Sequence, residues 1–115
     1  MARAGLTGTL DSVAGLYQLT GLKLGRNDLN GTLLPIHNLT ELIILDLDRN
    51  NFHGTLQPVS GLTQLTWLSI DAHPVEDLHI HGRDNRLNGT IDVLGDLLQL
   101  THLSLRHHNF TSSID

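Results

Sequence analysis

A unit of 23 residues that returns along the chain constrains its fold more than any other feature of the sequence. The pattern Leu-x-x-Leu-x-x-Leu-x-Leu-x-x-Asn-x-Leu-x-Gly-Thr-Leu begins at Leu16, and it returns 23 residues later at Leu39 with Phe in place of one Leu. A third copy begins at Leu62 and carries 12 extra residues at 73–84, and a fourth begins at Leu97. Self-similarity with a period of roughly 20–50 residues predicts a solenoid, in which each unit buries its apolar face only against its neighbours.

The Leu-x-Leu step inside each unit predicts a short β-strand, because alternate side chains of a strand point to the same face. Such strands would stack in parallel, one beside the next, at 22–24, 45–47, 68–70 and 103–105. The other apolar positions would return the chain on the convex side as turns or 3-10 segments. We therefore expect an α/β-type repeat solenoid in a single domain over residues 1–115, with a partial unit at 1–15 and units starting near 16, 39, 62 and 97.

A polar residue also recurs, just after each predicted strand. It is Asn27, Asn50 and Asn85 in the first three units, whereas the fourth unit has His108 at this position. A buried Asn can both donate to and accept from backbone groups of the turns around it, which would otherwise lack partners. We expect the three Asn side chains to be buried and to hydrogen-bond the backbone.

The pattern resembles the leucine-rich repeat family over residues 6–115, and most closely its plant-type class, in which Leu-x-Gly-x-Ile/Leu follows the Asn. Similar Gly-Thr-Leu repeats occur in protist surface proteins. The resemblance implies a right-handed superhelix with a short parallel β-sheet on its concave face, which acts as a non-enzymatic, secreted or cell-surface recognition module. The chain departs from the family in four ways: Pro35 and Pro58 fall one place late, the unit is one residue short, His108 stands at the Asn position of the fourth unit, and Cys-bearing end caps are missing.

Composition argues against several other classes of function. The net charge is -5, from 7 basic and 12 acidic residues, whereas nucleic-acid binding needs a basic surface. No apolar run approaches the roughly 18 residues of a membrane-spanning helix. The chain has no Cys, no Gly-rich phosphate loop after a strand and no His-Glu-x-x-His motif. We expect neither enzymatic activity nor a cofactor.

The positions between the leucines of the predicted strands would set the chemistry of the concave face. The chain's only Trp, Trp67, would lie next to Ile44 and form an exposed apolar spot. Trp is favoured at binding hot spots, although Trp67 packing under the insertion at 73–84 is the alternative. We expect a protein, peptide or glycan ligand on this face. The partner-binding candidates are Ile44, Trp67, Asp46, Asp48, Asp71, His102 and Arg106.

Three of these candidates, Asp46, Asp48 and Asp71, would form an acidic cluster. Such a cluster can accept a basic group or, with waters, Ca²⁺. Solvated polar residues on an open sheet are the more common explanation, and we prefer it here.

The insertion at 73–84 is the segment least like the repeat. His79 and His81 would share one face of an extended segment, as a metal-binding pair would, but no zinc spacing is matched. We expect a loop that widens the binding surface rather than a metal site.

Four Asn-x-Thr sequons begin at Asn30, Asn38, Asn88 and Asn109. They predict N-linked glycans if the chain enters a secretory path. Asn30 and Asn88 occupy the same position of the unit, so coincidence with the repeat is the alternative. A separate group, His102, His107 and His108, suggests either pH-sensitive binding or simply a polar edge, which we favour.

The chain begins and stops within a unit, at Met1 and Asp115. A solenoid that ends within a unit exposes core residues and an open strand edge, and such surfaces tend to pair with a further unit or another chain. We expect either an excerpt of a longer repeat protein or end-to-end stacking of chains into a fibre, and we favour the excerpt.

Overall fold

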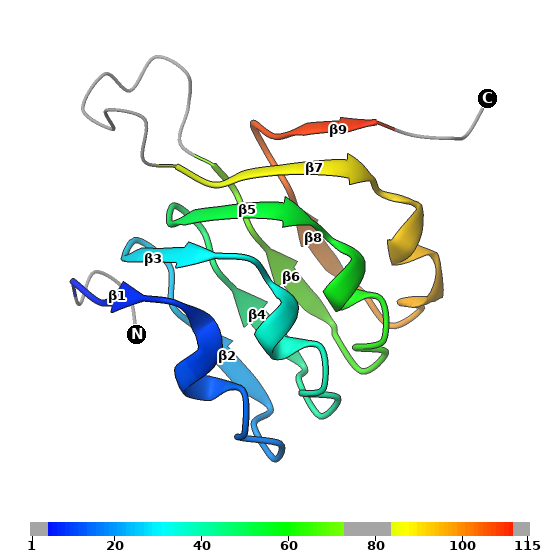
Figure 1. Cartoon of the computed structure of the whole chain (residues 1–115). Coiled ribbons are helices and arrows are strands. Elements are labelled where there is room, and N and C mark those ends of the chain that lie inside the picture. The colour runs from blue at the N-terminus through cyan, green and yellow to red at the C-terminus, as the bar shows by residue number, and fades with distance from the viewer. Residues whose placement is uncertain (1–4, 73–83, 112–115) are drawn as a thin grey trace.

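The structure is a computed structural model in which residues 5–72 and 84–111 are described. The chain winds through successive units, and each unit contributes strands to two parallel sheets (Figure 1). The four-stranded sheet, called the concave sheet below, has the order β2-β4-β6-β8. Its strands are β2 (Gly21–Lys23), β4 (Ile44–Asp46), β6 (Trp67–Ser69) and β8 (His102–Ser104). The predicted solenoid with one short parallel strand per unit is therefore confirmed, although each strand begins and ends one residue earlier than expected.

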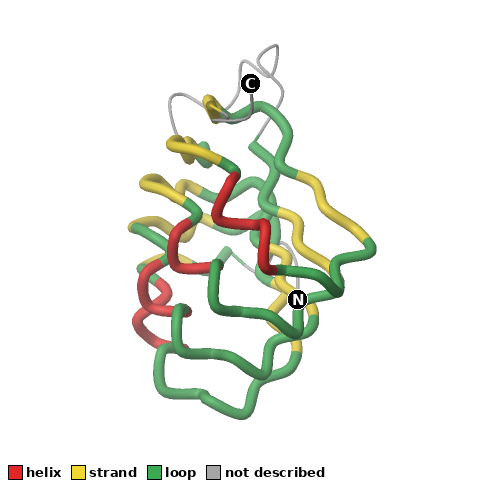
Figure 2. Tube along the Cα trace, turned by 90° about the vertical axis from the view of Figure 1, so that its right-hand side faces the viewer, coloured by secondary structure: helices red, strands yellow, loops and turns green. Residues whose placement is uncertain are grey.

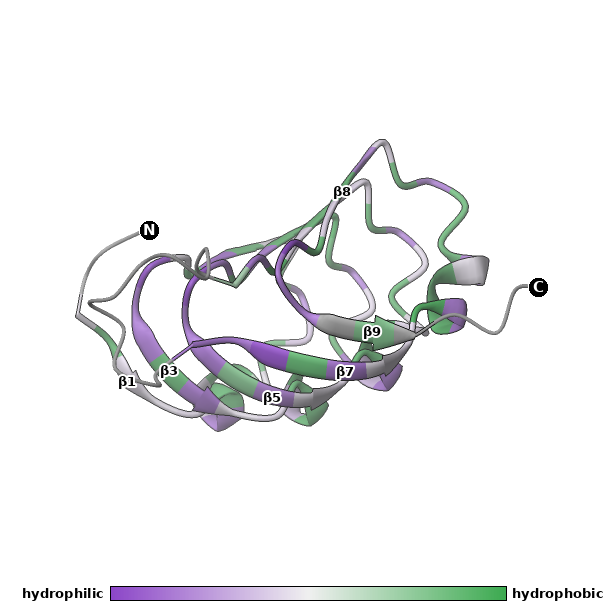
Figure 3. Ribbon diagram, turned by 90° about the horizontal axis from the view of Figure 1, so that it is seen from above, coloured by the Kyte–Doolittle hydropathy of each residue, from purple (hydrophilic) through white to green (hydrophobic). Residues whose placement is uncertain are grey.

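A second sheet, of five strands in the order β1-β3-β5-β7-β9, was not predicted. Its strands are β1 (Thr7–Gly8), β3 (Asp28–Gly31), β5 (Asn51–Thr55), β7 (Arg86–Thr90) and β9 (Asn109–Thr111). Figure 3 shows these five strands side by side, with hydrophilic and hydrophobic bands alternating along β7. The Leu-x-Gly-Thr residues that follow the recurring Asn are thus extended and paired from unit to unit.

The recurring glycine makes this second sheet possible. Gly54 has φ +94, and a Cβ there would lie 3.4 Å from Thr32 Cγ2 of the preceding unit. Gly89 repeats the arrangement against Thr55, with φ +87. A side chain at either position would be strained by its backbone conformation and crowded by the threonine.

Four 3-10 helices follow the strands of the second sheet: η1 (Leu10–Val13), η2 (Leu34–Ile36), η3 (Gln57–Val59) and η4 (Asp92–Asp96). In Figure 2 these helices lie on the side of the molecule opposite the concave sheet. Pro35 and Pro58 stand near the starts of η2 and η3, where a missing N–H is tolerated. The convex 3-10 segments are therefore confirmed.

The core lies between the two sheets and the 3-10 helices, and it is built from the repeated apolar positions. Leu45 and Leu68 are fully buried and pair in register on β4 and β6. The pairing of β6 with β8 keeps this register despite the 12 extra residues between them in the sequence. No helix in the described parts of the chain is long and apolar enough to cross a bilayer.

Candidate partner-binding face

Trp67 stands out on the concave sheet as a large apolar side chain that stays 42 % exposed. Its ring stacks on the ring of His102, with centroids 3.6 Å apart and planes 12° from parallel. On its other side, Trp67 pairs in register with the half-buried Ile44 of β4. Three adjacent strands thus place a flat aromatic platform beside an apolar side chain. We call Ile44, Trp67 and His102 the Trp67 platform.

The aspartates of the concave sheet are engaged with the protein itself. The carboxylate of Asp48 accepts hydrogen bonds from Ser69 Oγ, at 2.7 and 2.9 Å, and from the backbone N–H of Asp71 at 2.6 Å. One unit later, the carboxylate of Asp71 accepts from Ser104 Oγ at 2.8 Å and from the backbone N–H of Arg106 at 2.7 Å. The side chains link each unit to the next, which corrects our expectation of merely solvated residues.

Asp46 completes this group through Oδ1, which accepts from the backbone N–H of Asp48 at 3.1 Å. Burial raises the pKa of Asp48 above its usual value; the hydrogen bonds from Asp71 and Ser69 lower it, while the charges of Asp46 and Asp71 raise it further. Among the described residues, no group of three or more His, Asp or Glu side chains is arranged to hold a metal ion. The Ca²⁺ alternative therefore gains no support here.

The ends of the concave strands carry a polar pocket of about 170 Å³. Arg106 lines it together with Arg26, Arg49 and the two linking aspartates. Arg26 and Arg49 have φ values of 59 and 54, at equivalent positions of successive turns. The pocket thus mixes guanidinium groups with carboxylates that already accept internal hydrogen bonds.

The recurring Asn residues form the expected backbone-binding ladder. Asn50 is 2 % exposed. Its Oδ1 accepts from the N–H of Leu29 in the preceding unit at 3.1 Å, and its Nδ2 donates to Leu24 O at 2.8 Å. Asn85 repeats this with the N–H of Phe52 at 2.9 Å and with Leu47 O at 3.0 Å. The predicted burial and bonding of these Asn side chains are confirmed.

His108 belongs to the same ladder, which corrects the interpretation of the His cluster as a polar edge. Its Nδ1 accepts from the backbone N–H of Leu87 at 3.0 Å, and its Nε2 contacts the carbonyl oxygen of Ile70. His107 is exposed, whereas His102 stacks on Trp67. The three residues therefore have three different environments. In the sequence the three His residues shared only their proximity to one another. The feature that could have predicted the role of His108 was its place in the unit, where the other units have Asn.

The sequons lie away from the concave sheet. Asn30 and Asn88 are exposed on β3 and β7 of the second sheet, and Asn38 is exposed just after η2. Asn109 begins β9. The metal candidates His79 and His81 lie outside the described residues.

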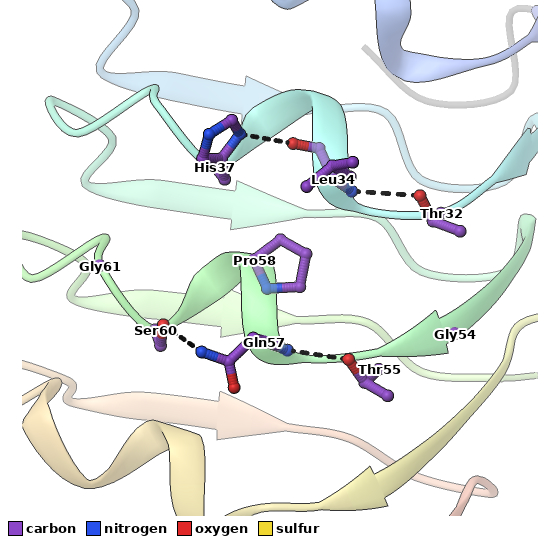
Figure 4. A pocket seen from close by; sticks show the side chains of 9 residues that line it. All are labelled: Thr32, Leu34, His37, Gly54, Thr55, Gln57, Pro58, Ser60 and Gly61. Carbon is purple, nitrogen blue, oxygen red and sulfur yellow. Dashed lines mark hydrogen bonds between the residues drawn. The ribbon is translucent and has the colours of Figure 1, made fainter.

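An apolar groove of about 620 Å³ lies between η2 and η3, on the convex side (Figure 4). Its polar groups bond one another: Thr32 Oγ1 accepts from Leu34 N–H, and Gln57 Nε2 donates to Ser60 Oγ. None of the predicted partner-binding residues lines this groove. It is therefore a separate feature from the Trp67 platform.

Solved structures with this fold include leucine-rich repeat ectodomains of plant receptors. The ectodomain of the receptor kinase SOBIR1 from Arabidopsis thaliana is 27 % identical over 96 % of this chain and 55 % of that chain, with a TM-score of 0.74. The BIR3–SERK2 complex from Arabidopsis thaliana matches at 26 % identity, over 96 % of this chain and 55 % of that chain, with a TM-score of 0.76. The plant peptide hormone receptor RGFR1, in complex with RGF2, is 24 % identical over 92 % of this chain and 16 % of that chain, with a TM-score of 0.73.

The chain thus spans about half the length of the first two structures. No protein-family model matches it, and no curated protein matches it by sequence. The repeat pattern, the two parallel sheets and these structures together show that the chain has the fold of a leucine-rich repeat solenoid.

Proposed function

We propose that this leucine-rich repeat chain is a non-enzymatic recognition module that binds a peptide or protein partner on the concave sheet, with Trp67 as its anchor. The exposed indole of Trp67, stacked on His102, carries the proposal. When a partner covers a large aromatic ring that was exposed to solvent, the free energy of the complex is lowered, and Trp is enriched at hot spots.

The backbone beneath the Trp67 platform favours binding because it is held in place before a partner arrives. Trp67 lies on β6, which pairs with β4 on one side and β8 on the other. The stack on His102 also restricts the ring, so less conformational entropy is lost on binding. The neighbouring BIR3–SERK2 and RGFR1–RGF2 structures are complexes with a protein and with a peptide, in agreement with such a role.

We further propose that the chain is secreted or lies at a cell surface and carries N-linked glycans. Several of the solved neighbours are ectodomains. Glycans on the exposed Asn30, Asn38 and Asn88 would leave the concave sheet uncovered, since these residues lie on β3, after η2 and on β7. A glycan ligand is the less supported choice of partner, because the BIR3–SERK2 and RGFR1–RGF2 complexes hold a protein and a peptide.

The test is selection of a random peptide library against the chain, followed by affinity measurements on two variants. Trp67→Ala should weaken the selected peptides by about 30-fold or more, the loss expected of a hot spot. Tyr17→Ala is the matched control, because Tyr17 is a 59 % exposed aromatic residue outside the concave sheet. Peptides that bind Trp67→Ala as tightly as the wild type, while the variant stays folded, would rule out the Trp67 platform as the anchor.

The second candidate function is structural: chains stack end to end into a fibre. The observation that favours it is the exposure of large apolar side chains in the last unit, with Leu98 87 % exposed and Leu103 on β8 48 % exposed. Tyr17 and Leu16 of the first unit are also exposed. Flanking units of a longer protein would cover the same surfaces, so solution size decides between the two.

A further inference from the structure

The last rung of the Asn ladder is a titratable side chain, and the ladder geometry shows which of its nitrogens must carry a proton. Asn50 and Asn85 each accept one N–H of the preceding unit and donate to one carbonyl oxygen of that unit. His108 meets the equivalent pair, the N–H of Leu87 and the carbonyl oxygen of Ile70. Nδ1 of the ring therefore takes the place of the Asn Oδ1 as acceptor, and Nε2 takes the place of the Asn Nδ2 as donor.

The partners fix the tautomer of His108, because neither partner can change its role. A backbone N–H only donates, so Nδ1 must be unprotonated and accept from Leu87. A backbone carbonyl only accepts, so Nε2 must carry the hydrogen that Ile70 receives. Only the neutral ring with its hydrogen on Nε2 satisfies both groups.

A second proton on this ring would break the rung. Nδ1–H would point at the N–H of Leu87, and Leu87 is only 1 % exposed, so its amide would lose its acceptor in a buried place. His108 is itself half-buried and packs against the ring of Phe110, with centroids 5.2 Å apart. The imidazolium would therefore be poorly solvated as well as badly bonded.

The charged groups around His108 do not remove this penalty. Asp84 and Asp71 favour the protonated ring, and His107 disfavours it. Arg86 also lies near the ring, since it lines a cavity of about 400 Å³ that His108 borders. Burial is the largest influence and lowers the pKa of His108 below its usual 6.5, whereas the bond to Ile70 raises it.

We propose that His108 makes the last unit of this solenoid acid-sensitive: protonation of its ring breaks the rung to Leu87 and releases β9 from β7. The other rungs use Asn, which does not titrate, so the effect is confined to the last unit. Under the proposed function the same step loosens β8, which carries His102, and so opens one side of the Trp67 platform; that consequence alone rests on the proposed function.

The sign follows from the lowered pKa. Above pH 6.5 the ring is neutral in both the folded and the open state, so pH has no effect through this group. Below 6.5 the open state takes up a proton that the folded state resists. The equilibrium constant for closing the unit then falls by about tenfold per pH unit, until the folded ring is protonated too.

The experiment uses the whole 115-residue chain, labelled with ¹⁵N, and needs no partner. Ring ¹⁵N shifts report the tautomer and pKa of His108, and hydrogen-exchange protection factors report the opening of Leu87 and, as internal reference, Leu29, whose acceptor is Asn50. Between pH 6.5 and 5 the protection of Leu87 should fall relative to that of Leu29, by at most about tenfold per pH unit.

Two variants separate His108 from the other histidines. His108→Asn restores an Asn rung and should abolish the acid-dependent loss at Leu87. His107→Asn, a matched change at an exposed residue with φ 69 that Asn tolerates, should keep it. A ring hydrogen on Nδ1, a pKa at or above 6.5, or equal acid loss in wild type and His108→Asn would overturn the proposal. The first two readings need only the wild type, so they decide the matter even if His108→Asn does not fold.

Discussion

The sharpest test of how this solenoid is held together is the removal of one rung of its Asn ladder, by Asn50→Ala. Asn50 is 2 % exposed, and its amide reaches two units. Its Oδ1 accepts from Leu29 N–H, while its Nδ2 donates to the carbonyl oxygens of Leu24, Leu47 and Asp48 at 2.8, 3.3 and 3.2 Å. Alanine supplies none of these groups.

The size of the effect follows from the groups left without partners. Of the groups that Asn50 bonds, only the buried N–H of Leu29 is left without a partner, because the carbonyl oxygen of Leu24 also accepts from Asn27 Nδ2 at 3.0 Å; an unsatisfied buried group costs about 1–3 kcal/mol. The carbonyl oxygens of Leu47 and Asp48 also keep other donors, Asn85 Nδ2 and the N–H of Arg26, so we assign them little. The expected loss is about 2 kcal/mol, a sizeable part of the roughly 5–15 kcal/mol that stabilises an ordinary domain.

Urea unfolding followed by circular dichroism measures this loss. A change of about 2 kcal/mol lowers the urea midpoint by roughly 0.7–2 M for ordinary m-values. Asn38→Ala is the matched control: the same substitution at an exposed residue outside the ladder, expected to stay within about 0.5 kcal/mol of the wild type. If Asn50→Ala unfolds as the control does, the ladder bonds do not stabilise the stack and the reasoning fails.

Three further predictions concern charge, assembly and modification. Burial raises the pKa of Asp48, so the folded state holds the proton of this carboxyl more tightly than the unfolded state does. Ionisation of Asp48 as the pH rises from 4 to 7 therefore costs stability, and Asp48→Asn should remove that cost. A change in the free energy of unfolding between pH 4 and pH 7, measured with urea, that is the same in Asp48→Asn and in the wild type would contradict this. Leu98→Lys should disperse any assemblies that light scattering detects at high concentration, whereas a monomeric wild type would exclude the fibre. Expression through a eukaryotic secretory path should glycosylate Asn38, and an amidase should then lower the mass and convert Asn38 to Asp; an unchanged mass would reject glycosylation.

The repeat made much of the fold predictable, because the same strand and turn positions can be read from four copies of the unit instead of from one segment. Alternation within Leu-x-Leu placed leucines such as Leu45 and Leu68 inside and left Trp67 to face outward. The recurrence of Asn after each strand predicted a buried side chain that satisfies the turns. The second sheet escaped prediction because its strands contain Gly and Thr in a pattern that also suits a turn, and only pairing with the next unit extends them.

The candidate site divides in the same way between sequence and structure. The sequence alone placed Trp67 beside Ile44 and His102, since equal spacing puts equivalent residues in neighbouring strands. It did not determine that Trp67 and His102 stack, nor that Asp48 bonds Ser69 of the next unit rather than solvent.

The position of His108 was likewise legible in the sequence, but its hydrogen bonds were not. Equivalent positions in successive units determine which side chains are neighbours, whereas the distance and rotation between stacked units decide which of them form hydrogen bonds. The partners of His108 come from residues 21 and 38 positions earlier in the chain. Only the packing of complete units brings a ring nitrogen, a backbone N–H and a carbonyl oxygen to one point, so the tertiary structure alone turned a substituted Asn into a titratable rung.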